Sequence, residues 1–147
     1  MGGSYHSDGP QLSNSPFLLL MGCENNSKSG GESVVVNVLN IFKFLKKNKK
    51  NYFKKLNDFF YFEKRGFKKN NKPTVIRKKI FENNRKAFKF RYLRDYILSG
   101  YKIKNKKIEK TRLLALNYLD KLMNSKNYSE TFKLGNGDVI IINNYKT

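Results

Sequence analysis

The chain has 147 residues and a formal net charge of +20 at pH 7, from 31 basic and 11 acidic residues. Hydrophobic residues make up 39% of it and aromatic residues 14%, which is enough for one domain with a packed core and argues against disorder. No apolar run approaches the ~20 residues that span a bilayer. The single cysteine cannot form an internal disulfide, so we expect a reducing compartment and a cytoplasmic protein with no membrane partner.

The strong positive charge allows two interpretations. A lysine-rich surface gains affinity for nucleic acid when it displaces counterions from phosphates, so a small lysine-rich nucleic-acid-binding protein is the alternative function. The other interpretation is a codon bias, because Lys (25) far exceeds Arg (6), although Arg is the better partner for phosphates and base edges. On composition alone we favour the bias and expect no specific nucleic-acid partner.

The N-terminal third predicts a loop, two strands and a helix. Residues 4–15 are polar and rich in turn formers, which predicts a loop. The apolar run PFLLLMGC at 16–23 is too short for a secretory signal and predicts a buried strand, with Cys23 as a small core residue. β-branched residues predict a second strand at about 33–37, and apolar residues at helical spacing predict a helix over 38–47.

The middle of the chain predicts a short helix and a hairpin. Apolar side chains continue at helical spacing over 52–60, and the segment 61–67 is expected to be extended. Alternating apolar residues then predict a hairpin whose arms lie at 75–81 and 87–92 and whose turn lies at 82–86.

The C-terminal third predicts the clearest helix and two further strands. Regular leucines give an apolar face to a helix over about 106–124. Strands at 131–134 and 139–143 flank Gly-Asn-Gly-Asp, which is a hairpin-type turn. Strands that come in hairpins, interrupted by helical insertions, predict a mainly β fold such as an antiparallel sandwich or jelly roll.

The chain has one histidine, His6, and Asp8 follows it two places later. In an extended segment, residues two apart point to the same side, so the imidazole and the carboxylate can converge on one ion. A second histidine from elsewhere would complete the facial triad of a non-haem Fe(II) oxygenase and leave three coordination positions open. Because the chain contains no second histidine, the pair alone predicts only part of a metal site.

Four short motifs follow one another in a characteristic order. They are YHSDGP at 5–10, SGGES at 29–33, FKFRY at 88–92 before a helix, and L-x-x-GD-x-x-x-x-NN at 134–144. In this order and spacing they resemble the taurine dioxygenase-like (TauD/TfdA) family of Fe(II)/2-oxoglutarate-dependent oxygenases. The clavaminate synthase-like branch is the most similar. The resemblance covers nearly the whole chain, from about 4 to 147.

The resemblance implies an incomplete double-stranded β-helix, or jelly roll, with His6 and Asp8 as the first two iron ligands. The Ser33 hydroxyl would help to hold the cosubstrate, 2-oxoglutarate; the alternative is a hydroxyl at the edge of a strand with no such role. Two glycines at 30–31 would allow a tight backbone path beside it; taken by themselves, they indicate an ordinary turn. The implied reaction is the hydroxylation, or in some branches the desaturation, of an amino-acid-like or other small polar substrate.

The resemblance also bears on the substrate and on what is missing. Arg91 and Arg94 could meet a carboxylate of the substrate; the alternative is a solvent-facing or interface pair. In the family, the strand after the GD motif continues to a histidine, the third iron ligand, and an arginine beyond it binds 2-oxoglutarate. Residues 1–147 would then be a partial domain that lacks its N-terminal portion and the C-terminal strand with the third ligand. We expect little or no activity from the chain alone, unless a second polypeptide supplies that ligand.

Overall fold

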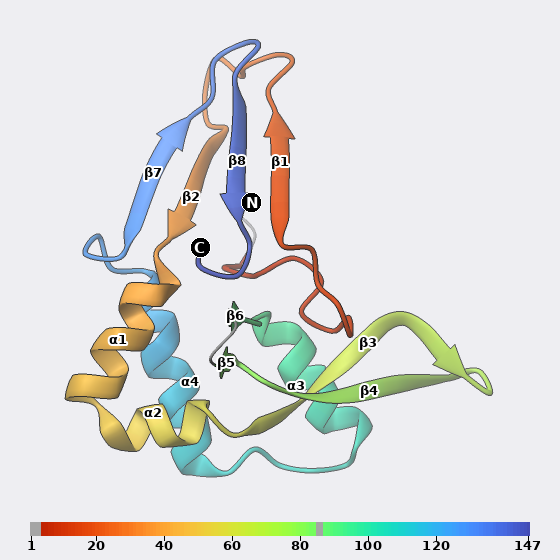
Figure 1. Cartoon of the computed structure of the whole chain (residues 1–147). Helices are drawn as coiled ribbons and strands as arrows, with labels where there is room; N and C mark the ends of the chain where they lie inside the picture. The colour runs from red at the N-terminus through yellow and green to blue at the C-terminus, as the bar shows by residue number, and fades with distance from the viewer. Residues whose placement is uncertain (1–3, 85–86) are drawn as a thin grey trace.

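The computed structural model describes residues 4–84 and 87–147, which form a mixed α/β structure with small antiparallel sheets. Two pairs of strands stand on a base of helices and a long hairpin (Figure 1). The sequence predicted a mainly β fold with helical insertions, but helices make up a larger part of the structure than that prediction implies. In chain order the elements are β1 (Leu18–Gly22), β2 (Glu32–Val36), α1 (Val38–Asn48), α2 (Lys50–Leu56), β3 (Phe59–Lys69), β4 (Lys72–Lys79), β5 (Phe81–Asn83), β6 (Phe88–Phe90), α3 (Arg94–Ile103), α4 (Lys110–Met123), β7 (Ser129–Lys133) and β8 (Val139–Asn143).

The strand pairs above the base are two separate antiparallel ladders. β1 pairs with β8, which places Leu20 opposite Ile141, and β2 pairs with β7, which places Ser33 opposite Phe132. The predicted hairpin between the last two strands is therefore wrong. The segment after β7 crosses from one ladder to the other, beside the segment that joins β1 to β2 (Figure 1). Turn formers at 134–138 indicate a change of direction, but a local signal does not determine which strand becomes the partner.

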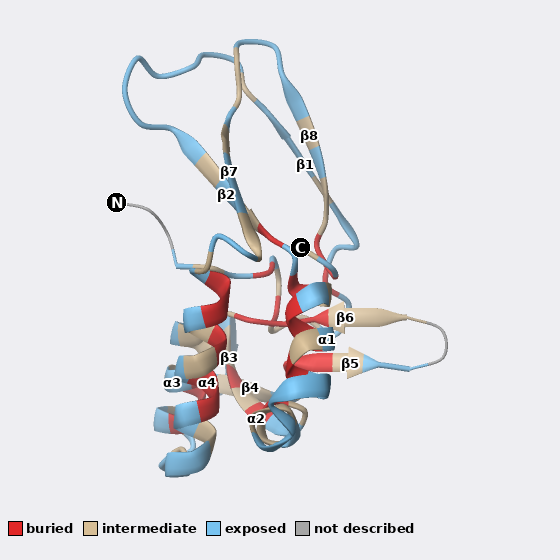
Figure 2. Cartoon of the chain, turned by 90° about the vertical axis from the view of Figure 1, so that its left-hand side faces the viewer, coloured by how far each residue is buried: buried red, intermediate tan, exposed pale blue. Residues whose placement is uncertain are grey.

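β1 is a strand, as predicted, but the prediction that it is buried is wrong. Leu20 is 71% exposed and its partner Ile141 is 64% exposed, and Leu18 and Val139 are exposed on the same face. Because alternate residues of a strand share a face, this ladder has an apolar face that no described element covers. Figure 2 colours much of β1 and β8 as exposed. A continuous apolar run is typical of a strand covered on both sides. Cys23, at the end of β1, is only half-buried.

Helices α1 and α2 form largely where the sequence predicts them. Asn37 caps α1, because its side-chain Oδ1 accepts a hydrogen bond from Asn40 N at 3.0 Å. The inner side of α1 presents Ile41 and Leu45 to the core, where they join Leu116 of α4. This core lies inside the base, below the ladders (Figure 2).

The pattern of residues does not predict α3, which packs its buried Ile97 and Tyr101 towards β3. Gly100 allows the close approach, since a Cβ at this position would lie 2.4 Å from the Tyr61 carbonyl oxygen. The predicted C-terminal helix is confirmed as α4, but it begins at Lys110 rather than at about 106. No helix of the described residues combines the length and the apolar character needed to cross a membrane.

The long hairpin β3–β4 occupies residues for which the sequence predicted the end of a helix and one arm of a different hairpin. Helix α2 ends at Leu56 rather than near 60, and the phenylalanines that follow lie in β3. Asn70 and Asn71 adopt φ values of 50° and 58°, which suits the tight turn between β3 and β4. The predicted hairpin at 75–92 is largely wrong, because most of its first arm pairs with β3 and only β5 and β6 keep that pairing. Part of its predicted turn, 85–86, lies outside the described residues.

Candidate metal centre

A short extended segment at the N-terminus carries the two predicted ligands. His6 forms an antiparallel bridge with Leu93. Ser7 N donates a hydrogen bond to Tyr92 O at 2.9 Å, and Tyr92 N donates to Ser7 Oγ at 3.0 Å. Ser7 is buried. Since neighbouring residues of an extended segment alternate in direction, the inward Ser7 leaves His6 and Asp8 together on the outer side.

The imidazole and the carboxylate come together as the spacing predicts. His6 Nε2 lies 3.4 Å from Asp8 Oδ1, and both side chains are about half exposed. His6 Nδ1 lies 2.8 Å from Ser4 O; because a carbonyl can only accept, the neutral ring is protonated at Nδ1 and keeps the Nε2 lone pair free. Two ligands on adjacent octahedral positions, each at about 2.1 Å from a metal, lie about 3.0 Å apart. The pair therefore fits one edge of a coordination shell.

A third residue, Asn144, holds Asp8 in place. Its Oδ1 accepts a hydrogen bond from Asp8 N at 2.8 Å, and its Nδ2 donates to Asp8 O at 3.0 Å and to Pro16 O at 2.8 Å. Asn144 is 2% exposed and follows the last residue of β8. Sequence reasoning noticed the Asn143-Asn144 pair in a motif but missed this positioning role. The signal was an amide side chain directly after an apolar strand.

The site as described offers two metal ligands rather than three. No group of three or more His, Cys, Asp or Glu side chains that could hold a metal occurs within residues 4–84 and 87–147. Two ligands bind a divalent ion weakly compared with the three of a facial triad. The donor set thus fits part of an iron centre, and no reaction step can be derived from it alone.

Ser33 lies on the other ladder, as the second residue of β2. It shares a strand face with Val35, two residues on. Val35 lines a cavity of about 420 Å³, together with Asn143 and Lys146 from the end of β8 and the residues after it. The Ser33 hydroxyl therefore lies on the same side of β2 as this cavity. Its role with the cosubstrate stays a prediction.

The two glycines before Ser33 adopt the backbone that the sequence predicts. Gly30 and Gly31 have φ values of +73° and +81°, a region that residues with a side chain rarely occupy. A Cβ at Gly31 would also lie 2.6 Å from Ser27 Oγ. The backbone therefore turns tightly at this point, and a role for this turn beside the cosubstrate stays a prediction.

The side chain of Arg91 is 1% exposed and is used inside the protein. Its Nη1 donates to Leu12 O at 3.1 Å and to Ser15 Oγ at 3.3 Å, and its Nη2 lies 3.5 Å from Ser13 O. Its Nε lies 3.4 Å from a carboxylate oxygen of Glu82. The guanidinium thus fixes the loop that follows the ligand segment. A contact with a substrate carboxylate stays a prediction.

Arg94 is partly buried beside α4. Its Nη1 lies 3.2 Å from Asp120 Oδ2, and its Nη2 donates to Asn117 Oδ1 at 2.7 Å. The Tyr92 hydroxyl donates to the same Asp120 carboxylate. Burial, and then the Asp120 charge, raise the pKa of Tyr92 far above its usual value. This cluster anchors the strand segment that pairs with Ser7, and the role of Arg94 with substrate also stays a prediction.

A histidine and a carboxylate that converge on one point are two of the three ligands in the facial triad of non-haem Fe(II) oxygenases. Comparison with known proteins agrees, because the model of the "Taurine catabolism dioxygenase TauD, TfdA family" matches residues 1–147. The chain belongs to this family, whose members depend on Fe(II) and 2-oxoglutarate.

Individual relatives match only over part of their length. Gamma-butyrobetaine dioxygenases from Homo sapiens and Pongo abelii are each 30% identical over 149 aligned residues, and the match covers 97% of this chain and 38% of theirs. A solved structure of asparagine oxygenase in complex with Fe(II), 2S,3S-3-hydroxyasparagine and succinate matches with a TM-score of 0.69 at 13% identity. That match covers 97% of this chain and 41% of the other. The chain therefore spans about two fifths of the length of these proteins and shares their fold there.

Proposed function

We propose that the chain is the portion of a Fe(II)/2-oxoglutarate-dependent dioxygenase that contributes His6 and Asp8 as two of three iron ligands. The observation that carries the proposal is the distance of 3.4 Å between His6 Nε2 and Asp8 Oδ1. Two neighbours support it, since the Ser4 carbonyl fixes the tautomer of the imidazole and Asn144 fixes the main chain of Asp8. When bound, the iron would support a reaction in which O2 oxidises 2-oxoglutarate to succinate and CO2 with one oxygen atom and hydroxylates a C–H bond of the substrate with the other.

In this proposal the fold is an incomplete jelly roll, and residues 1–147 are a partial domain. The two antiparallel ladders and the likeness to part of asparagine oxygenase support it. The exposed apolar face around Leu20 and Ile141 is where further strands would pack, because a two-stranded ladder is only marginally stable by itself. The third ligand would come from another polypeptide segment, for example a second chain that carries a histidine.

The substrate in this proposal is a small molecule with a carboxylate and a nitrogen centre. The relatives are named for gamma-butyrobetaine and asparagine, and both compounds have these two groups. Arg94, which keeps part of its side chain exposed, and Arg91 are the candidates for the carboxylate of the substrate. Ser33 is the candidate for the cosubstrate.

Anaerobic titration of the isolated chain with Fe(II) and 2-oxoglutarate tests whether the centre is partial. We expect the charge-transfer absorption of intact family members to be absent or very weak, because two protein ligands hold the ion poorly. A strong band at stoichiometric Fe(II) would contradict the proposal that the chain carries only part of the centre.

Binding of Mn(II), followed by the loss of its free-ion electron paramagnetic resonance signal, tests the two ligands themselves. We expect weak binding that falls about tenfold or more in His6→Ala and in Asp8→Ala. Asp95→Ala is the matched control, since Asp95 is an exposed carboxylate in the first turn of α3. Equal Mn(II) affinity in the parent chain and in both ligand variants would remove His6 and Asp8 from the proposed centre.

A further inference from the structure

A second candidate site lies at the other end of α3. Leu93, the partner of His6, directly precedes α3, whereas Tyr101, near the end of the helix, lines a surface pocket of about 260 Å³. The start of β3, part of β4 and the loop before α4 supply the other walls. None of the residues proposed above as ligands of iron, cosubstrate or substrate lines this pocket.

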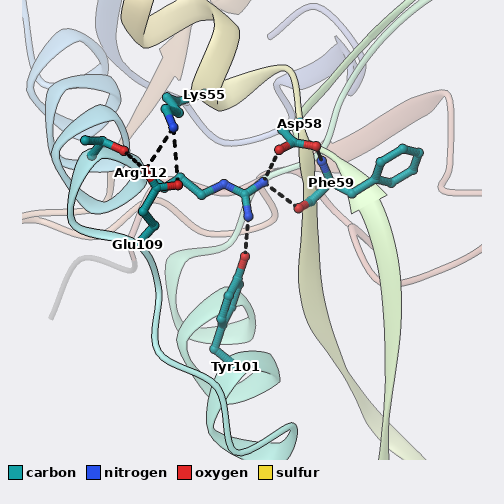
Figure 3. A network of polar contacts seen from close by, with 7 residues as sticks. Lys55, Asp58, Phe59, Tyr101, Glu109 and Arg112 are labelled. Atoms are coloured by element: carbon teal, nitrogen blue, oxygen red, sulfur yellow. Dashed lines mark hydrogen bonds and ion pairs between the residues drawn. The ribbon is translucent and has the colours of Figure 1, made fainter.

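Two ion pairs hold the walls of this pocket together, and Figure 3 shows both. Arg112 Nη2 lies 2.9 Å from Asp58 Oδ2, and Arg112 Nη1 donates to Tyr101 Oη at 2.9 Å. Lys55 Nζ lies 2.9 Å from Glu109 Oε1. The two carboxylates that line the pocket are therefore each matched by a cation, and this frame contributes no net charge.

Three further cations line the pocket and have no such match. Arg77, Lys106 and Lys107 form no ion pair within the described part of the chain. The guanidinium of Arg77 lies 5.3 Å from the ring centroid of Phe59 and 5.7 Å from that of Tyr61. Lys106 Nζ lies 3.3 Å from Tyr61 Oη. The walls thus combine three uncompensated positive charges with three aromatic rings, those of Phe59, Tyr61 and Tyr101.

The phenol of Tyr61 responds to this positive potential. A hydrogen bond from Lys106 lowers the pKa of Tyr61, and the charges of Lys106, Arg77 and Lys104 lower it further. Helix α4 also begins here, at Lys110, and the N-terminal end of a helix carries partial positive charge. A place that favours a phenolate favours other anions for the same reason.

We propose that this pocket binds the phosphate group of a small phosphorylated molecule. Three cations, one of them a guanidinium fork, suit a phosphate dianion better than a singly charged carboxylate. The volume is below the usual range of ~300–1,000 Å³ for a complete ligand, so it fits a phosphate with little else. The ring of Phe59, which is 43% exposed, offers an apolar surface for the organic part.

Isothermal titration of the whole chain with inorganic phosphate and with phenyl phosphate, at about 150 mM NaCl, tests the proposal. We expect both to bind with 1:1 stoichiometry, and phenyl phosphate to bind more tightly because its ring can rest on Phe59. The variant Arg77→Gln/Lys106→Gln/Lys107→Gln should weaken both by about tenfold or more. All three side chains are exposed, so the variant should keep the thermal midpoint of the parent.

The matched control removes the same charge elsewhere. Lys28, Lys43 and Lys126 are exposed, and their triple change to Gln should leave phosphate affinity within about twofold. If both triple variants lose affinity equally, binding reflects the net charge of the chain and the proposal fails. Should the pocket variant lose its fold, the single change Arg77→Lys provides the test, since it keeps the positive charge but removes the guanidinium with its paired donors. Unchanged phosphate affinity in Arg77→Lys would overturn the role of Arg77.

Nucleic acid is the competing ligand for such a surface. A single-stranded oligonucleotide should be displaced from the pocket by millimolar phenyl phosphate if the pocket recognises single phosphate groups. If the oligonucleotide binds through Arg77, Lys106 and Lys107 while neither small phosphate binds, the proposal is overturned in favour of a surface for polyanions.

Discussion

Asn144 holds Asp8 through both polar groups of its main chain, since it accepts from Asp8 N at 2.8 Å and donates to Asp8 O at 3.0 Å. The two residues are 136 positions apart in the chain. The position of one predicted metal ligand therefore depends on the end of the last strand. A ligand held in this way keeps its place without the ion, which favours binding because less order must be gained.

Replacing Asn144 with Ala should reduce the free energy of unfolding by about 1–3 kcal/mol, because it leaves part-buried main-chain groups of Asp8 and Pro16 without their partner. Urea unfolding followed by circular dichroism measures the change. The control Asn127→Ala removes an exposed amide and should cost less than about 0.5 kcal/mol. A loss of stability at Asn144 no greater than in this control would contradict the positioning role.

The local elements were predictable because each depends on a short pattern of residues. Apolar residues at helical spacing gave α1, and the apolar runs at 18–22 and 139–143 gave strands β1 and β8. The pairing of strands was not predictable, because the turn around 135–138 looks the same whether the chain folds back or crosses to a distant partner. The residue pattern alone does not predict helix α3, although the family resemblance places a helix after FKFRY. What holds α3 is contact with β3, at Gly100 in particular, and a short pattern does not carry that information.

In the candidate metal site, too, the local arrangement was predictable and the long-range contacts were not. The spacing of His6 and Asp8 was sufficient to predict that they point to one place, since it depends only on the alternation of an extended segment. The supports of the pair are long-range: Ser7 contacts Tyr92, and Asn144 contacts Asp8. Similarly, the sequence does not predict that Arg91 is buried, because a guanidinium is buried only where acceptor groups from another segment bind it.

Replacing Arg91 with Gln should reduce the free energy of unfolding by about 3 kcal/mol, because its contacts with the loop at 12–15 and with Glu82 are lost. Chemical denaturation measures this effect. The control Arg65→Gln changes an exposed guanidinium with one weak ion pair and should cost less than about 1 kcal/mol. If Arg91→Gln leaves stability unchanged, its guanidinium is free for another task, and contact with the substrate becomes the better assignment.

The exposed face of the β1–β8 ladder should make the isolated chain prone to self-association, because it combines apolar side chains with unpaired strand edges. The double change Leu20→Thr/Ile141→Thr should reduce light scattering at high protein concentration. It should alter the free energy of unfolding by no more than about 1 kcal/mol, since both side chains are mostly exposed. Leu116→Ala, in the buried core, is the contrasting variant and should cost about 2–5 kcal/mol. Scattering that does not fall in the double variant would show that this face is not the cause.

Tyr92 should give the protein a stability that declines in alkali. Burial and the Asp120 carboxylate raise the pKa of Tyr92 above its usual value near 10, so the folded chain holds this proton more tightly than the unfolded chain does. The stabilising contribution is complete below about pH 10 and falls as the pH rises further, because only the unfolded chain then releases the proton. Tyr92→Phe removes this dependence, so the free energy of unfolding of the variant should fall less steeply between about pH 9 and 11 than that of the parent chain. At neutral pH the free energy of unfolding of the variant should be about 1–2 kcal/mol lower than that of the parent. Tyr96→Phe, a change on the first turn of α3, should keep the steeper decline of the parent. Parallel curves for the parent chain and Tyr92→Phe in urea titrations across this range would mean that the phenol is not held in its neutral form by the fold.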